Sequence, residues 1–230
     1  MAFLVQLLWH VYSPALTAKA QPLPAPMSVE TYRLLSLNEA LPTARYLNLW
    51  LQSFDNQAGI SLSFNQLDYN MIARWLDTIL ALDERGQYPM LVAAHVYGSI
   101  QNEQKKRFMM NYVFEKFMQH PNRYWRWLAH AVIVAKHELH DTQLALLYAD
   151  ALASRATGEN VPYWAKDLKI IVLEDMGELQ AAKVLVGGLM ESGDISDPYE
   201  LNFLLQKIQV LEQKLMKTQQ SVENSTKTSQ

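Results

Sequence analysis

The chain has no cysteine among its 230 residues, and this absence excludes several kinds of site at once. Without thiols there is no disulfide, no cysteine-ligated zinc site and no cysteine nucleophile. Glycine is scarce, with eight residues, and runs of Val, Ile and Thr are few, which argues against a sheet. Half of the residues are hydrophobic, which is ample for a buried core. We therefore expect an all-α protein.

The sequence also lacks an excess of positive charge and the common motifs of catalysis. Its net charge is −3, and its Lys and Arg residues are dispersed, whereas binding a nucleic-acid backbone needs clustered basic side chains. No Gly-x-Ser-x-Gly turn is present, and no Gly-rich loop is followed by Lys-Ser or Lys-Thr. We predict no catalytic residue, no cofactor and no enzyme activity.

The histidines do not form a metal-binding pattern. His130 and His137 are two helical turns apart, roughly 10 Å along the axis of one helix. A zinc ion needs three or four ligands that converge on one point. The sequence therefore predicts no metal site.

Two adjacent stretches in the middle of the chain are expected to form a helical hairpin. Arg123–Leu139 is apolar around most of a helical circumference, with Arg126, His130 and His137 as a narrow polar stripe. A helix this apolar is covered by other helices on several sides. Asp141–Arg155 follows after a short break, which favours an antiparallel pair.

From Asp68 onward the chain matches itself at an offset of 36 residues. Ala93, Ala129 and Ala165 share one column, and small residues at one position let neighbouring helices approach closely. The other columns are Ala73, Met109, Ala145 and Ala181; Leu76, Tyr112, Tyr148 and Val184; Val92, Leu128 and Trp164; and Val96, Val132 and Leu168. Helix pairs that repeat in this way are expected to stack and bury one continuous core.

The unit length and the paired helices resemble tetratricopeptide repeats. The clearest similarity is Met176–Ala182, MGELQAA, which looks like the turn between the two helices of such a unit. His140–Ala145 occupies the same place one unit earlier. The resemblance implies a right-handed stack of antiparallel helix pairs, a tetratricopeptide-like α-solenoid, whose surface binds other proteins.

We expect four further parts around the repeats, which occupy residues 68–196. Residues 28–67 hold a first helical pair and an extended connector, with a capping box at Ser36–Glu39 that opens a helix. Residues 197–217 form a C-terminal helix that starts at Asp-Pro and caps the array. Residues 218–230 are rich in Ser, Thr, Gln and Asn, which predicts a disordered tail.

Residues 1–27, the fourth part, are a hydrophobic segment and a Pro-rich spacer that allow three interpretations. Met1–Ala18 has no charged side chain and suits a membrane anchor, although a full span needs about 20 apolar residues. Ala18–Ala20 fits the cleavage site of a secretory signal, but the positive charge at the start of such signals is missing. The third interpretation is an arm that packs on the domain or a partner. We expect membrane association through this segment, with a periplasmic or secreted form cleaved near Ala20, or a cytoplasmic protein, as alternatives.

Basic and aromatic residues are interleaved at the start of the central helix. Such clusters either fill a core or bind a partner, because Trp, Tyr and Arg dominate binding hot spots. We take Arg123, Arg126, His130 and Tyr163 as candidate partner-binding residues. The predicted function is a non-catalytic protein–protein interaction scaffold or adaptor, and, with an anchored N-terminus, a small subunit of an envelope complex. The alternatives are a helical-repeat RNA-binding protein and a helical domain of an enzyme.

Overall fold

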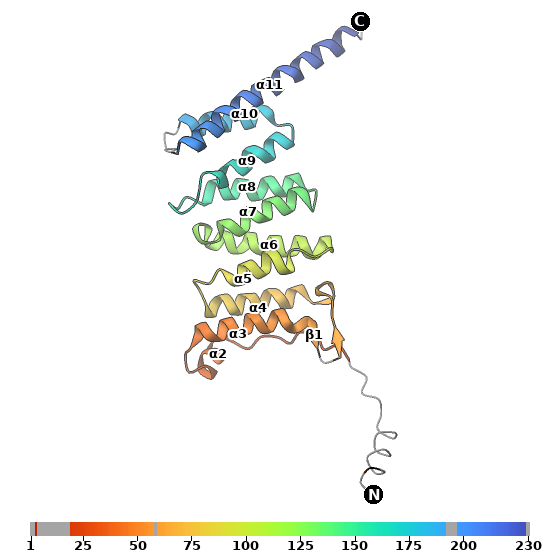
Figure 1. Cartoon of the computed structure of the whole chain (residues 1–230), viewed down its shortest axis with the longest axis vertical. Coiled ribbons are helices and arrows are strands. Elements are labelled where there is room, and N and C mark those ends of the chain that lie inside the picture. The colour runs from red at the N-terminus through yellow and green to blue at the C-terminus, as the bar shows by residue number, and fades with distance from the viewer. Residues whose placement is uncertain (1–2, 4–18, 58, 192–196, 229–230) are drawn as a thin grey trace. The chain divides into compact units, whose positions relative to one another are not determined.

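The computed structural model describes residues 3, 19–57, 59–191 and 197–228 (Figure 1). Helices joined by short turns make up nearly all of this part of the chain, and its only strands are β1 (Asn56–Gln57) and β2 (Ile60–Ser61). The predicted all-α class is therefore confirmed, apart from one small hairpin. Apart from Phe3, the hydrophobic segment Met1–Ala18 lies outside the described residues.

The chain divides into two compact units, Met1–Asp83 and Glu84–Gln230. The first unit contains helices α2 (Val29–Leu35), α3 (Ala40–Gln52) and α4 (Tyr69–Leu82), with short 3₁₀ turns η1 (Ser53–Asp55) and η2 (Phe64–Gln66) beside the hairpin. Helix α4 packs on both α2 and α3. Its N-cap Asp68 accepts hydrogen bonds from the N–H groups of Asn70 and Met71, which satisfies free amides at the helix start.

The helix start predicted at Ser36 is wrong. Ser36 ends α2, and the next two residues, Leu37 and Asn38, take positive φ angles of 51° and 68°. The N–H of Asn38 donates to the carbonyl of Arg33, so this turn satisfies the free carbonyls of α2 rather than the amides of α3. Helix α3 begins after Glu39, whose side chain makes no capping hydrogen bond.

The second unit is a succession of helices, each packed on the next along the chain (Figure 1). Helix α6 also contacts α8, and α7 also contacts α9. The elements are α5 (Tyr88–Leu91), the π-helix η3 (Val92–Tyr97), α6 (Glu103–Gln119), α7 (Pro121–His137), α8 (Thr142–Arg155), α9 (Trp164–Asp175), α10 (Leu179–Glu191) and α11 (Pro198–Thr228). Contacts between successive helices are typical of a linear array.

The two central helices lie close to their predicted ranges. Helix α7 has Pro121 at its first position, where a missing N–H costs nothing. Helix α8 is capped by Asp141, whose carboxylate accepts from the N–H of Leu144. Between them His140 has a φ of 49°, which turns the chain sharply. The two helices pack on each other across this turn.

The alanine column has the burial expected of close helix contacts. Ala93, Ala129 and Ala165 are 0%, 3% and 0% exposed. The columns fail in the last unit, where Ala181 and Val184 are exposed. Ala182 and Val186 are buried instead, because α10 begins one residue later than the offset of 36 from α8 places it.

Another departure is Trp164. Its column partners Val92 and Leu128 are fully buried, whereas Trp164 is 48% exposed. Its indole makes an edge contact with Trp125, with ring centroids 5.4 Å apart. The residues of this column are therefore buried at Val92 and Leu128 and half-exposed at Trp164.

Helix α11 is longer than predicted. It starts at Pro198, as expected, with Asp197 accepting from the N–H of Tyr199. It continues past Lys217 to Thr228, so the predicted disordered tail differs from the structure over Thr218–Thr228. After Pro198 the sequence has no Gly or Pro to stop the helix.

A shared core holds α11 against its neighbours. Leu204 and Leu211 of α11 pack with Ile170 of α9 and with Ala182 and Val186 of α10. No helix in the described ranges is long and apolar enough to cross a bilayer.

Candidate functional site

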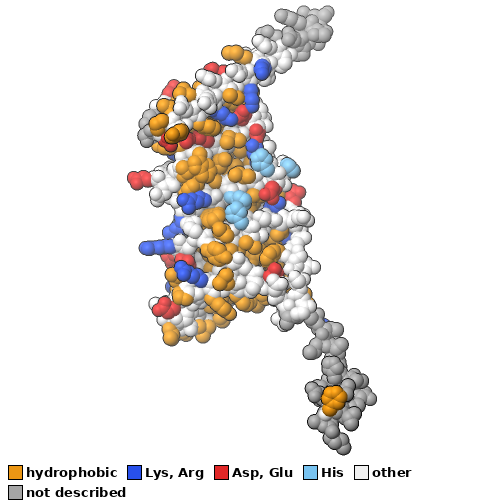
Figure 2. Space-filling model, viewed as in Figure 1, with side chains coloured by type: hydrophobic (Ala, Val, Ile, Leu, Met, Phe, Trp, Pro, Cys, Tyr) orange, Lys and Arg blue, Asp and Glu red, His pale blue; other side chains and the backbone are white. Residues whose placement is uncertain are grey.

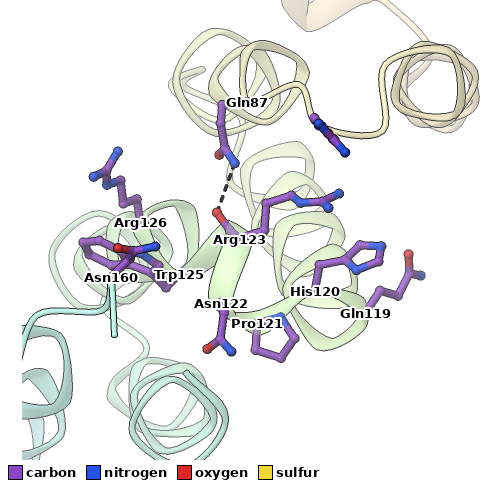
Figure 3. Close-up of a pocket in the computed structure, with 10 residues that line it drawn as sticks. Gln87, Gln119, His120, Pro121, Asn122, Arg123, Trp125, Arg126 and Asn160 are labelled. Carbon is purple, nitrogen blue, oxygen red and sulfur yellow. Dashed lines mark hydrogen bonds between the residues drawn. The ribbon is translucent and has the colours of Figure 1, made fainter. Parts of the chain in front are cut away.

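An open pocket of about 880 Å³ lies in the second unit, where the chain enters three of its helices (Figure 3). Its walls come from the segment before α5, the junction of α6 and α7, and the loop before α9. The lining residues are Arg85, Gln87, Gln119, His120, Pro121, Asn122, Arg123, Trp125, Arg126 and Asn160. Three arginines and a histidine stand among them, and no acidic residue does.

Two hydrogen bonds tie the walls together at the repeat distance. The Nε2 of Gln87 donates to the carbonyl of Arg123 over 3.2 Å, and the N–H of Gly158 donates to Oδ1 of Asn122 over 2.8 Å. Both bonds join residues 36 positions apart. A Cβ at Gly158 would lie 2.9 Å from Cγ of Asn122, so a larger residue there would displace the Asn122 side chain. Residues one offset of 36 apart are thus linked directly in two places.

Helix α7 also holds the segment before α5 in place. The Nε1 of Trp127 donates to Oε1 of Gln87 over 2.8 Å, so the Gln87 amide is held at both its ends. The ring of His95, on η3, meets the ring of Trp127 edge-on, with centroids 6.0 Å apart. The segment before α5 is therefore fixed to the first two turns of α7.

The predicted residues Arg123 and Arg126 both line the pocket. Nη1 of Arg123 donates to the carbonyl of Glu84, and its guanidinium lies 5.9 Å from the ring centroid of Tyr124. The guanidinium of Arg126 lies 5.1 Å from the ring centroid of Trp125. Within the described part of the chain, neither these two arginines nor Arg85 has a carboxylate within ion-pair distance. The three arginines of the lining are therefore not engaged in salt bridges.

His130 lies outside the pocket lining, in the contact between α7 and η3. Its ring stacks on that of His95, with centroids 3.9 Å apart. Burial and the neighbouring His95 lower the pKa of His130, which favours the neutral ring near pH 7. Its Nε2 is buried and has no hydrogen-bond partner among the described residues. The structure thus gives His130 a packing position.

Tyr163 also lies apart from the pocket lining. It is half-buried just before α9, and the ammonium of Lys166 lies 5.2 Å from its ring centroid. Sequence reasoning missed six polar lining residues: Arg85, Gln87, Gln119, His120, Asn122 and Asn160. The offset of 36 carried a signal for some of them, because it pairs Gln87 with Arg123 and Asn122 with Gly158.

A second group of charged side chains joins α9 to α11. Asp167 is 4% exposed and interacts with the carboxyl of Glu200, and burial together with Glu200 raises the pKa of Asp167 to about 8. Further along α9, Glu174 forms ion pairs with Lys207 and Lys214 of α11. These lysine partners lower the pKa of Glu174 although its partial burial opposes them.

No three His, Asp or Glu side chains come together as metal ligands in the ranges that the structure covers. Comparison with family models, curated proteins and solved structures finds no match for this chain. The resemblance to tetratricopeptide repeats remains a prediction, and a function has to be inferred from the site itself.

Proposed function

We propose that this chain is a non-catalytic protein–protein interaction scaffold whose partner binds at the arginine-lined pocket. In this proposal the helices of the second unit stack as right-handed antiparallel pairs, like tetratricopeptide repeats. Contacts of α6 with α8 and of α7 with α9, beside those between successive helices, support the stacking. The buried column Ala93, Ala129 and Ala165 supports a common spacing of the units.

The three arginines of the lining, which have no ion-pair partner, carry the proposal. Arg85 and Arg126 are exposed and Arg123 is half-buried, so their guanidinium groups are accessible, and Arg is enriched in binding hot spots. Arg126 instead lies on Trp125, and Arg123 is anchored on the carbonyl of Glu84. Both start from the first turns of α7, so they are held on a rigid element, which suits a binding site.

Site-specific photo-crosslinking in the native cells tests this role. A benzoylphenylalanine at Asn160, which lines the pocket and is exposed, is expected to give one discrete adduct with a partner protein. The same residue placed at Asn70, exposed on α4 in the first unit, serves as the matched control and should not give that adduct.

The adduct should also disappear when Arg126→Gln is added to the Asn160 variant, because the partner then loses its contact. Two results would contradict a partner site in the pocket: the same adduct from Asn160 and from Asn70, or an adduct from Asn160 that persists when Arg126→Gln is added.

A further inference from the structure

The free polar groups of the pocket are mostly hydrogen-bond donors, since several acceptors in its walls are already used. Oε1 of Gln87 accepts from Trp127, the carbonyl of Arg123 accepts from Gln87, and Oδ1 of Asn122 accepts from Gly158. The Nδ2 group of Asn122 and the remaining guanidinium N–H groups are therefore available to donate hydrogen bonds to a ligand. A surface of this kind selects acceptors, and Arg binds carboxylates with paired N–H groups.

The start of α7 adds to this preference. This 17-residue helix begins at Pro121 and has no acidic residue in its first turn. Its N-cap, His120, makes no side-chain capping hydrogen bond. The positive end of the helix dipole therefore faces the same region as the arginines and favours a negative ligand.

The dimensions of the pocket suit a chain segment rather than a single small ion. Its volume of about 880 Å³ lies near the upper end of the roughly 300–1,000 Å³ of typical ligand pockets. Figure 3 shows Arg123 and Arg126 extending in different directions from the start of α7. Figure 2 shows Lys and Arg side chains projecting along one edge of the view, near α5 and α7. Cations spread in this way match several negative groups in a row.

We infer that the pocket binds an acidic segment of a partner polypeptide, with consecutive Asp or Glu side chains on Arg85, Arg123 and Arg126. This rests on the proposed partner-binding role of the pocket and adds the chemistry of the partner.

A polypeptide suits the pocket better than a nucleic acid does. Single-stranded nucleic acids bind to aromatic platforms on which their bases stack. The only Trp, Tyr or Phe in the lining is Trp125, and Arg126 lies on its ring.

Fluorescence anisotropy with a fluorescein-labelled Glu decapeptide and the full chain tests the inference. The chain is expected to bind this peptide and to discriminate against Gln and Lys decapeptides. The triple variant Arg85→Gln/Arg123→Gln/Arg126→Gln should bind at least about tenfold more weakly, because it removes charge-assisted hydrogen bonds.

The matched control is Arg45→Gln/Arg74→Gln/Lys217→Gln. It removes the same total charge from exposed positions outside the pocket lining and should leave affinity for the Glu decapeptide nearly unchanged. The single variants Arg85→Gln and Arg126→Gln should each weaken binding without moving the thermal midpoint, so a folding defect is separated from lost binding.

Three results would overturn the inference: equal affinity of the two triple variants, equal binding of the Glu and Gln decapeptides, or tighter Arg-dependent binding of a uridine decanucleotide. If the unaltered chain does not bind the Glu decapeptide but the crosslink from Asn160 still forms, the partner is not acidic. If the unaltered chain gives neither decapeptide binding nor the crosslink from Asn160, the proposed scaffold function itself is contradicted.

Discussion

Ala129→Trp is expected to lower the free energy of unfolding by about 1–3 kcal/mol or more. Ala129 is 3% exposed on α7, and α7 packs on α6 and α8. A Trp side chain cannot enter such a contact unless the helices move apart, and neighbouring side chains then leave their preferred rotamers. Urea denaturation followed by circular dichroism measures the change.

Ile133→Trp provides the matched control, because Ile133 lies one turn further along the same helix and is 48% exposed. Its indole can turn towards solvent, so the expected change is within about 0.5 kcal/mol. An unchanged stability of the Ala129 variant would show that this column does not mark a close helix contact, and the stacked-repeat interpretation would lose its main support.

The contribution of Asp167 to the stability of the second unit is expected to decrease as pH rises from about 4 to about 9. In the folded chain, burial and Glu200 raise the pKa of Asp167 from 3.8 to about 8, so the folded state holds a proton that the unfolded state has released. The stabilisation is therefore complete below the unfolded pKa and is lost as pH passes through the folded pKa. Deprotonation leaves two facing carboxylates, only partly offset by Lys207.

Asp167→Asn is expected to flatten this pH dependence, because its amide stays neutral beside Glu200 over the whole range. At pH 9 it should be more stable than the unaltered chain by on the order of 2 kcal/mol. Thermal unfolding between pH 5 and pH 9 provides the measurement. The control is Asp150→Asn, at an exposed residue paired with Lys169, and it should keep the slope. A pH dependence of stability that Asp167→Asn leaves unchanged would contradict a proton held on Asp167 in the folded state.

The central helices could be predicted because apolar periodicity is strong there. It places α7 and α8 within two residues of their observed ends, although α7 begins at Pro121 and not at the predicted Arg123. At Ser36 the local signal was ambiguous, because Ser is common at helix starts and in turns alike. Only the hydrogen bond from Asn38 back to Arg33 decides that the residue closes α2.

Only part of the candidate site could be predicted from the sequence. Arg123 and Arg126 stood out because they are interleaved with aromatic residues on one helix. Arg85 and Asn160 lie far from them along the chain, and the fold brings all four to one pocket. His130 lies on the same helix as the arginines, but its ring packs on His95. Helical periodicity cannot tell which polar residue faces a neighbour and which faces a pocket.

Tryptophan indole NMR signals report directly on where an acidic segment binds. The chain has six Trp residues, and Trp→Phe variants assign their ¹⁵N–¹H signals. When the Glu decapeptide is added, we expect the signals of Trp125, which lines the pocket, and Trp127, which donates to Gln87, to shift. The signals of Trp50 and Trp75 in the first unit should stay in place. Shifts confined to Trp50 and Trp75, or no shift at saturating peptide, would contradict binding at the arginine-lined pocket.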